Sequence, residues 1–206
     1  MEENIKFNKM AILLLIISGL VYSQTLYLGA NGDIGIINTN SKTGIGLGLN
    51  GEYKLQTLPF SLRFTYRVYT ATFSDAEKLS KHSYNMSVID GDILYHPFTG
   101  SLDAYIGLGI SYSLPKITQD GNVLEINNKI VRPKNAENTL NINLLLGFRF
   151  VPERFFSPYI ELFYWPMQLK YDILLEDRYG NVSKLEGNTG LEKYLIRLGF
   201  CLRIYN

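Results

Sequence analysis

The sequence is poor in the residues that usually hold metals or form disulfides, since it has one cysteine, Cys201, and two histidines. A single cysteine cannot form a disulfide within the chain, which excludes a disulfide framework. Acidic and basic residues nearly balance, for a formal net charge of +1, so no basic surface indicates nucleic-acid binding. The sequence also has no cluster of metal-ligand residues and no glycine-rich phosphate loop. We therefore expect no cofactor, no metal and no nucleic-acid partner.

Long apolar runs are also scarce, and the only one is Met10–Val21, near the start of the chain. Two lysines precede this run, which is too short to cross a bilayer comfortably as a helix. The small residue Ser23 follows it, at a place that suits cleavage by signal peptidase. We expect residues 1–23 to be a cleaved secretory signal peptide and residues 24–206 to be the mature domain. An uncleaved anchor is the alternative, because two glutamates weaken the positive charge of the first residues.

The rest of the chain has no helical period, and apolar residues instead recur with period two in eight segments. Such alternation is typical of β-strands, whose successive side chains point to opposite faces. No charged residue lies on the apolar face, and we therefore expect an all-β protein with eight antiparallel strands. The apolar face consists of Leu26, Leu28, Ala30 and Ile34; Ile45, Leu47, Leu49, Tyr53 and Leu55; Leu62, Phe64, Tyr66 and Val68; Ile89, Gly91, Ile93 and Tyr95; Leu102, Ala104, Ile106, Leu108, Ile110 and Tyr112; Ile142, Leu144, Leu146, Phe148 and Phe150; Ile160, Leu162 and Tyr164; and Tyr194, Ile196, Leu198, Phe200, Leu202 and Ile204.

The opposite face of these segments carries charged, glycine and small polar residues. Six of its charged residues are acidic and six are basic, which favours mutual pairing. They are Asp33, Glu52, Lys54, Arg63, Arg67, Asp90, Asp92, Asp103, Arg149, Glu161, Arg197 and Arg203.

Two kinds of eight-stranded barrel explain this alternation: a soluble barrel with its apolar face inside, and a membrane barrel with that face outside. Three features favour the membrane barrel. Short and long connections alternate along the chain, and five tyrosines near the ends of the apolar strips suit an aromatic girdle. The charged face is also rich in glycine, as the narrow interior of eight strands requires. These glycines are Gly44, Gly46, Gly48, Gly107, Gly109, Gly147 and Gly199.

The connections differ in length and composition. The short ones carry proline, as in QTLPF, HPFTG and VPERFFSP, whereas long polar loops include residues 74–83, 115–138 and 176–190. We expect the short turns in the periplasm and the long loops outside the cell, where they are candidates to bind extracellular ligands. Two turn sequences, DGNV at Asp120–Val123 and YGNV at Tyr179–Val182, predict hairpin tips.

This layout resembles the eight-stranded outer-membrane β-barrel families, of the kind that includes OmpA-like transmembrane domains, OmpX-like and OmpW-like proteins. Its most specific part is the last strand, YLIRLGFCLRIYN, which looks like the segment that barrel-assembly machinery recognises. The candidate assembly-signal residues are Arg197, Gly199, Leu202 and Ile204. The resemblance implies an up-and-down transmembrane barrel, porin-like in shape, that is integral to the outer membrane of a Gram-negative cell. Its expected partners are outer-membrane lipids and the assembly machinery, and we expect a monomer.

Closure of such a sheet in lipid places the charged face in a narrow lumen, where an unpaired ion is costly. We expect a salt-bridge network that plugs this lumen, with separately hydrated charges as the alternative. Above it, Tyr69, Phe163 and Trp165 are expected to pack over glycine or to border a shallow apolar cavity. Of the charged residues, Asp33, Arg67, Asp90 and Arg197 are expected nearer the long loops. The network is expected to contain Glu52, Arg63, Arg67, Asp90, Asp92, Asp103, Arg149, Glu161, Arg197 and Arg203.

Three functions are compatible with this barrel. The first is a structural or surface-interaction role, and the second is a narrow channel or carrier for small or hydrophobic molecules, as an OmpW-like resemblance suggests. The third, a lipid-modifying enzyme, needs a nucleophile and a base. HSYN, beginning at His82, does not reproduce the pattern of lipid A deacylases, and His96 lies beside a short turn at the other end. We therefore expect no enzymatic activity and favour the first role.

Overall fold

The computed structural model describes residues 24–36, 44–55, 58–74, 81–98, 100–120, 124–126, 129–152, 154–166, 168–177, 179–190 and 194–205. The expected signal peptide, residues 1–23, lies outside these ranges. In the described part of the chain, no helix is long and apolar enough to cross a membrane.

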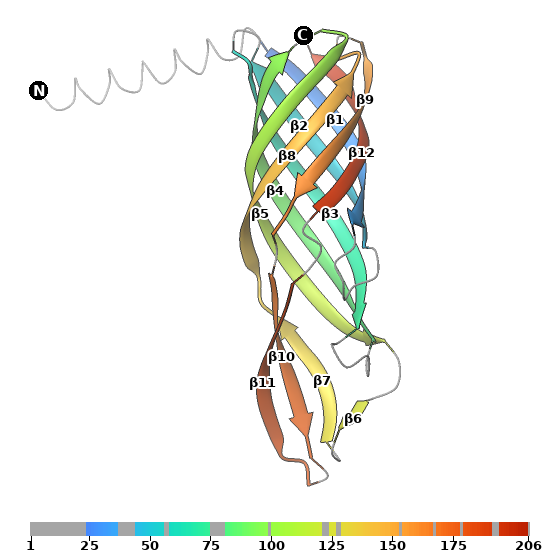
Figure 1. Ribbon diagram of the computed structural model, residues 1–206, viewed down its shortest axis with the longest axis vertical. Helices are drawn as coiled ribbons and strands as arrows, with labels where there is room; N and C mark the ends of the chain where they lie inside the picture. Colours follow the sequence, from blue (N-terminus) through green and yellow to red (C-terminus); the bar gives the residue numbers. More distant parts are fainter. Residues whose placement is uncertain are drawn as a thin grey trace, which may run out of the picture.

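Eight strands form a closed antiparallel barrel (Figure 1), as the sequence predicted. Each pairs with its two neighbours, and the ring closes where β12 pairs with β1, from Leu26 opposite Tyr205 to Ile36 opposite Tyr194. Because the sheet closes, the barrel has no edge strand over the length where all eight described strands pair. The barrel strands are β1 (Gln24–Ile36), β2 (Ile45–Leu55), β3 (Phe60–Ser74), β4 (Lys81–Phe98), β5 (Leu102–Asp120), β8 (Thr139–Phe150), β9 (Phe156–Tyr164) and β12 (Tyr194–Tyr205).

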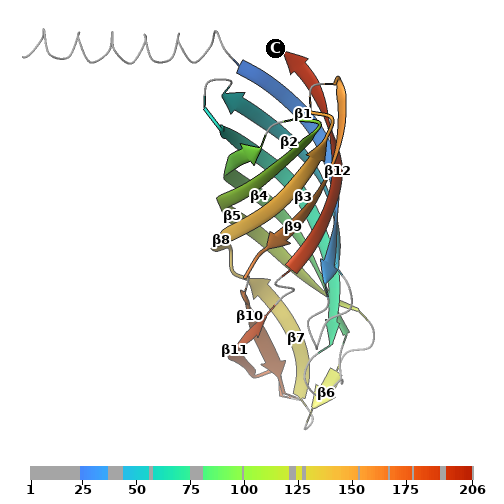
Figure 2. The same ribbon diagram turned by 45° about the horizontal axis from the view of Figure 1, so that its top comes forward.

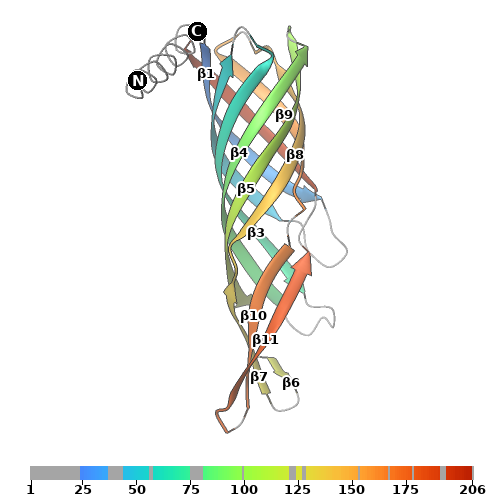
Figure 3. The same cartoon turned by 90° about the vertical axis from the view of Figure 1, so that its left-hand side faces the viewer.

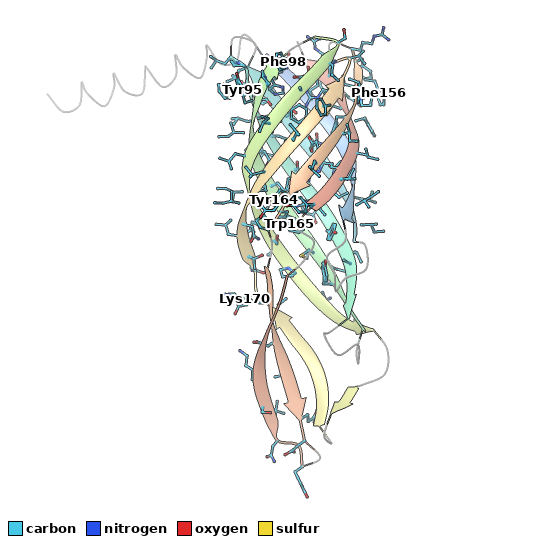
Figure 4. All side chains as sticks on the ribbon, viewed as in Figure 1. Tyr95, Phe98, Phe156, Tyr164, Trp165 and Lys170 are labelled. Atoms are coloured by element: carbon cyan, nitrogen blue, oxygen red, sulfur yellow. The ribbon has the colours of Figure 1, made fainter. Side chains whose placement is uncertain are left out.

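The apolar side chains of these strands cover the outside of the barrel. Leu47 and Phe64, for example, are 74% and 67% exposed, and their neighbours along each strand are more buried. In water, each Å² of this exposed apolar surface would cost roughly 25 cal/mol of free energy. The wall is therefore suited to hydrocarbon. Aromatic residues lie toward both ends of this wall, with Tyr95, Phe98 and Phe156 near one end and Tyr164 near the other (Figure 4).

The two ends of the barrel differ. The connections β2–β3, β4–β5 and β8–β9 are short and lie at the end where β1 begins and β12 ends (Figure 2). We call this the short-turn end. At the opposite, long-loop end, β3, β4 and β5 run on beyond the other barrel strands, and the chain between β5 and β8 and between β9 and β12 builds further strands.

These further strands form a four-stranded sheet beyond the barrel, in the order β11–β10–β7–β6 (Figure 3). They are β6 (Leu124–Ile126), β7 (Lys129–Ala136), β10 (Gln168–Glu176) and β11 (Val182–Gly190). The predicted hairpin at YGNV is confirmed, since Glu176 pairs with Val182.

The predicted hairpin at DGNV is wrong. The end of β5 pairs with β4, whereas Leu124–Ile126 pairs with Lys129–Val131 of β7. Ile126 lies opposite Lys129, so β6 and β7 pair with each other in the register of a hairpin. Residues 121–123 of DGNV lie outside the described ranges.

Candidate functional site

The charged face of the strands fills the lumen with one connected set of ion pairs. In the path given below, each residue is joined to the next by a salt bridge, and every residue is at most 1% exposed. The path runs Arg149, Glu52, Arg63, Glu161, Arg197, Asp33, Arg67 and Asp90. It links strands β1, β2, β3, β4, β8, β9 and β12, so it reaches around almost the whole barrel.

Arg63 holds the part of the network nearer the short turns. Its Nη2 donates to Oε2 of Glu52 at 2.9 Å, its Nε donates to the same oxygen at 3.1 Å, and its Nη1 pairs with Glu161. Arg149 pairs with the same Glu52 oxygen from the opposite wall. Tyr105 adds a neutral donor, with its hydroxyl 2.6 Å from Oε1 of Glu161. Two carboxylates are thus shared among several donors, as buried charges require.

Arg197 joins this part to the residues nearer the long loops. Its Nε donates to Oδ1 of Asp33 at 2.9 Å, and its Nη1 donates to Oε2 of Glu161 at 3.3 Å. Arg67 in turn pairs with Asp33 at 3.1 Å and with Asp90 at 2.9 Å. The charges nearer the long loops therefore belong to the same network, and Asp33, which was not among its expected members, joins it through Arg67 and Arg197.

His96 lies near the short β4–β5 turn, as expected, and it also contributes a second polar cluster that was not expected. It is buried, with Nδ1 2.8 Å from Oδ1 of Asp103 and Nε2 2.9 Å from Oγ of Ser61. Lys54 pairs with the other Asp103 oxygen at 3.1 Å, and Glu52 lies 3.8 Å from Nε2. The alternation of Asp90, Asp92 and Leu94 toward the lumen was the pattern that predicts a buried residue at position 96.

Ser61, His96 and Asp103 are connected by hydrogen bonds in the order in which the serine, histidine and aspartate of hydrolase triads are connected. Here the Ser61 side chain is completely buried within the sheet, beside Glu52 and Lys54 on the neighbouring strand. A nucleophile needs room for a substrate carbonyl and for donors to its oxyanion. The buried Ser61 hydroxyl has no such room, and it instead forms a hydrogen bond with Nε2 of His96.

One of the ten residues predicted for the network lies outside its ion pairs. Asp92 is buried, but the guanidinium opposite it in register, Arg63, turns to Glu52 and Glu161. Arg203 is partly exposed near the short-turn end, where its backbone N–H donates to the carbonyl of Phe155 at 2.9 Å. The prediction of a single ten-residue network is therefore wrong at Asp92.

Aromatic side chains occupy the lumen nearer the long loops. A Cβ atom added at Gly44 or Gly46 would collide with Tyr69, which therefore fills the space that these glycines leave. The edge of Tyr69 meets Trp165, with ring centroids 5.8 Å apart. Phe163 lies beside them in the same buried cluster, together with Tyr84, Met86 and Leu195.

This aromatic layer rests on the charged one. The guanidinium carbon of Arg67 lies 4.3 Å from the ring centroid of Trp165 and 4.8 Å from that of Phe163, and Arg197 approaches Phe163 to 4.5 Å. At the short-turn end, Arg149 lies 4.6 Å from the ring of Tyr27. Cation–π contacts of this kind strengthen when they are removed from water. The charged and aromatic layers are therefore in direct contact within the lumen.

The four residues of the predicted assembly signal divide between the two faces of β12. Arg197 is part of the lumen network, and Gly199 faces Tyr159, whose ring carbon would lie 2.5 Å from an added Cβ. Leu202 and Ile204 belong to the outer wall, where Ile204 is exposed. Cys201 is buried in the lumen beside Tyr27 and Tyr159.

Comparison with known proteins adds solved structures of the same architecture. No family model and no curated protein sequence matches the chain. The outer membrane protein OprG from Pseudomonas aeruginosa matches with a TM-score of 0.63 at 14% identity, over 89% of this chain and 97% of that one. A major outer membrane protein from Thermus thermophilus matches with a TM-score of 0.56 at 18% identity, over 89% and 100%.

The Escherichia coli outer membrane protein W matches with a TM-score of 0.54 at 9% identity, over 88% of this chain and 98% of that one. At identities this low, the likeness shows a shared fold alone. That fold agrees with the closed sheet, the apolar outer wall and the charged interior described above. The chain therefore has the fold of the eight-stranded outer-membrane β-barrels.

Proposed function

We propose that this protein is a closed outer-membrane barrel whose role is structural or one of surface interaction. In this proposal residues 1–23 are removed as a signal peptide, the short turns face the periplasm, and the sheet of β6, β7, β10 and β11 projects from the cell. The barrel wall contacts outer-membrane lipids, and β12 carries the signal for the assembly machinery. The monomer has no enzymatic role, and its lumen network serves as a plug.

The observation that carries the proposal is the ordered tip of the β10–β11 hairpin, at the far end of the projecting sheet. Oδ1 of Asp177 accepts hydrogen bonds from the backbone N–H groups of Tyr179 and Asn181, at 2.9 and 2.8 Å. Gly180 takes a positive φ of 79°, a conformation that glycine adopts without strain. The turn thereby holds Tyr179 in solvent, 91% exposed.

An exposed tyrosine on a pre-ordered turn is a favourable binding element. Aromatic residues are enriched among those that dominate the energy of protein interfaces, and a turn that is already ordered loses little entropy on binding. Nothing in the folding of the barrel requires an aromatic ring at this tip. Contact with a partner is therefore the role that best accounts for Tyr179.

Replacing Tyr179 by serine is expected to reduce binding by at least tenfold while the barrel remains folded. The measurement compares cells that display the full chain for attachment to extracellular-matrix protein, to phage and to neighbouring cells. Tyr179→Phe is the matched control, because it keeps the ring, and it should retain most of the binding. If deletion of residues 177–181 changes none of these interactions, the surface role is wrong.

A carrier for apolar molecules is the second candidate, favoured by a groove of about 560 Å³ on the barrel wall. Its lining includes Ile34, Ile45, Leu47 and Val68, and it is almost entirely apolar. Liposomes that contain the folded barrel would take up a small apolar solute faster than empty liposomes if the groove serves transport. Equal uptake, together with loss of surface binding in Tyr179→Ser, would exclude this candidate.

A further inference from the structure

Asp92 is a buried carboxylate that the lumen network leaves without a counter-charge. It is 3% exposed, and neither of its carboxylate oxygens has a hydrogen-bond partner in the described part of the chain. The charged groups that act on it are Asp90 on its own strand, Arg63 on β3, Glu161 on β9 and Arg197 on β12. Both arginines are already bound to other carboxylates, so neither neutralises Asp92 directly.

A second unpartnered acceptor is the side-chain oxygen of Asn143, which is completely buried. The neighbouring bonds fix the orientation of its amide group. The hydroxyl of Ser111 donates its one proton to Asp90 at 2.5 Å, so it can only accept from Asn143, whose Nδ2 lies 2.7 Å away. Nδ2 must therefore face Ser111, which leaves Oδ1 on the opposite side without a donor.

The two unpartnered oxygens converge over the same glycine. Asp92, Gly109 and Asn143 lie opposite one another on β4, β5 and β8. A Cβ atom added at Gly109 would collide with Oδ1 of Asp92 and would lie 2.6 Å from Oδ1 of Asn143. Only glycine leaves room for both oxygens here, and two acceptors that face each other without a proton between them repel.

The charges of the lumen point to the same place. Among the described residues, the buried carboxylates are Asp33, Glu52, Asp90, Asp92, Asp103 and Glu161, and the buried guanidinium groups are Arg63, Arg67, Arg149 and Arg197. Lys54 supplies a fifth positive charge to Asp103. The nitrogens of His96 face Ser61 and Asp103 rather than Asp92. None of these positive groups pairs with Asp92, whose two oxygens are left without a hydrogen-bond partner.

We propose that Asp92 and Asn143 form a binding site for one monovalent cation within the lumen, either a proton or an alkali-metal ion. A proton on Asp92 would be donated to Oδ1 of Asn143, and an alkali-metal ion would be coordinated by both oxygens. Either one satisfies the two unpartnered acceptors and neutralises the buried Asp92 carboxylate.

The test compares Asp92→Asn with the matched variant Asp90→Asn, two residues away on the same face of β4. The thermal unfolding midpoint of each full-length barrel is measured in detergent micelles. Asp92→Asn should keep or raise the midpoint, because the new amide donates to Asn143 and needs no counter-charge. Asp90→Asn should lower it by about 5 °C or more, because it breaks pairs with Arg67 and Arg197. An equal fall in both variants would overturn the proposal.

Two measurements on the unmodified protein identify the cation. For an alkali-metal ion, replacing choline chloride by sodium or potassium chloride at constant ionic strength raises the midpoint, and Asp92→Asn abolishes the rise. For a proton, the infrared spectrum contains a buried protonated-carboxyl band that disappears in Asp92→Asn, and the midpoint does not depend on sodium or potassium. The absence of both signatures would overturn the site.

Discussion

Replacement of Arg63 by methionine is expected to lower the unfolding midpoint of the barrel by about 6 to 20 °C. Arg63 is the donor that joins Glu52 to Glu161, and removing it leaves two buried carboxylates with fewer partners. Breaking a buried ion pair from one side typically costs about 3–5 kcal/mol. For a chain of this length, each kcal/mol corresponds to a shift of about 2–4 °C. Circular dichroism of the refolded protein in detergent micelles measures the midpoint.

The matched control for this variant is Lys116→Met, which makes the same kind of change at an exposed position on β5. Exposed charges contribute at most about 1 kcal/mol, so the control should unfold close to the unmodified protein. If Arg63→Met unfolds at the same temperature as Lys116→Met, the lumen charges are hydrated separately and do not form a cohesive network.

Replacement of Gly147 by valine is expected to prevent the barrel from folding. A Cβ atom at this position would lie 2.5 Å from two ring carbons of Tyr105. That ring cannot retreat easily, because its hydroxyl is bonded to Glu161 and its face lies 5.2 Å from the guanidinium carbon of Arg63. In a lumen that eight strands barely leave room to fill, overpacking displaces the network itself.

Gly32→Val provides the control for Gly147→Val. Gly32 lies on β1, and a Cβ atom there would meet no atom closer than 3.9 Å. Valine also suits a strand better than glycine does, so Gly32→Val should fold at least as well as the unmodified protein. Folded yields after dilution from denaturant into detergent compare the two. Equal yields would contradict a fixed position for Tyr105.

The architecture was predictable because it depends on a pattern that each strand repeats. In every segment, the alternation with period two separates the apolar residues of the outer wall from the polar residues of the lumen. The glycines of the charged face indicate that this face lines the narrow interior. Even the weakest segment, which includes Ile89 and Ile93, forms part of β4. The position of His96 was predictable too, since it continues the buried alternation of Asp90 and Asp92, but its nearness to a turn obscured the pattern.

The pairing inside the lumen was not predictable from register. Arg63 lies opposite Asp92 across β3 and β4, yet it reaches Glu161 on the far wall. A guanidinium on a long side chain can cross a narrow lumen, so proximity along the sheet does not decide its partner. The hairpin predicted at DGNV was wrong for a related reason, because β6 pairs with β7 and not with β5.

The central claim, that ion pairs and aromatic rings close the lumen, is tested most directly by recording current across a planar lipid bilayer. The unmodified full-length barrel is inserted at low density in concentrated potassium chloride. The filled lumen predicts no resolvable single-channel steps, because neither the charged nor the aromatic layer leaves a continuous path for hydrated ions. Regular, stepwise conductance from the unmodified protein would contradict it.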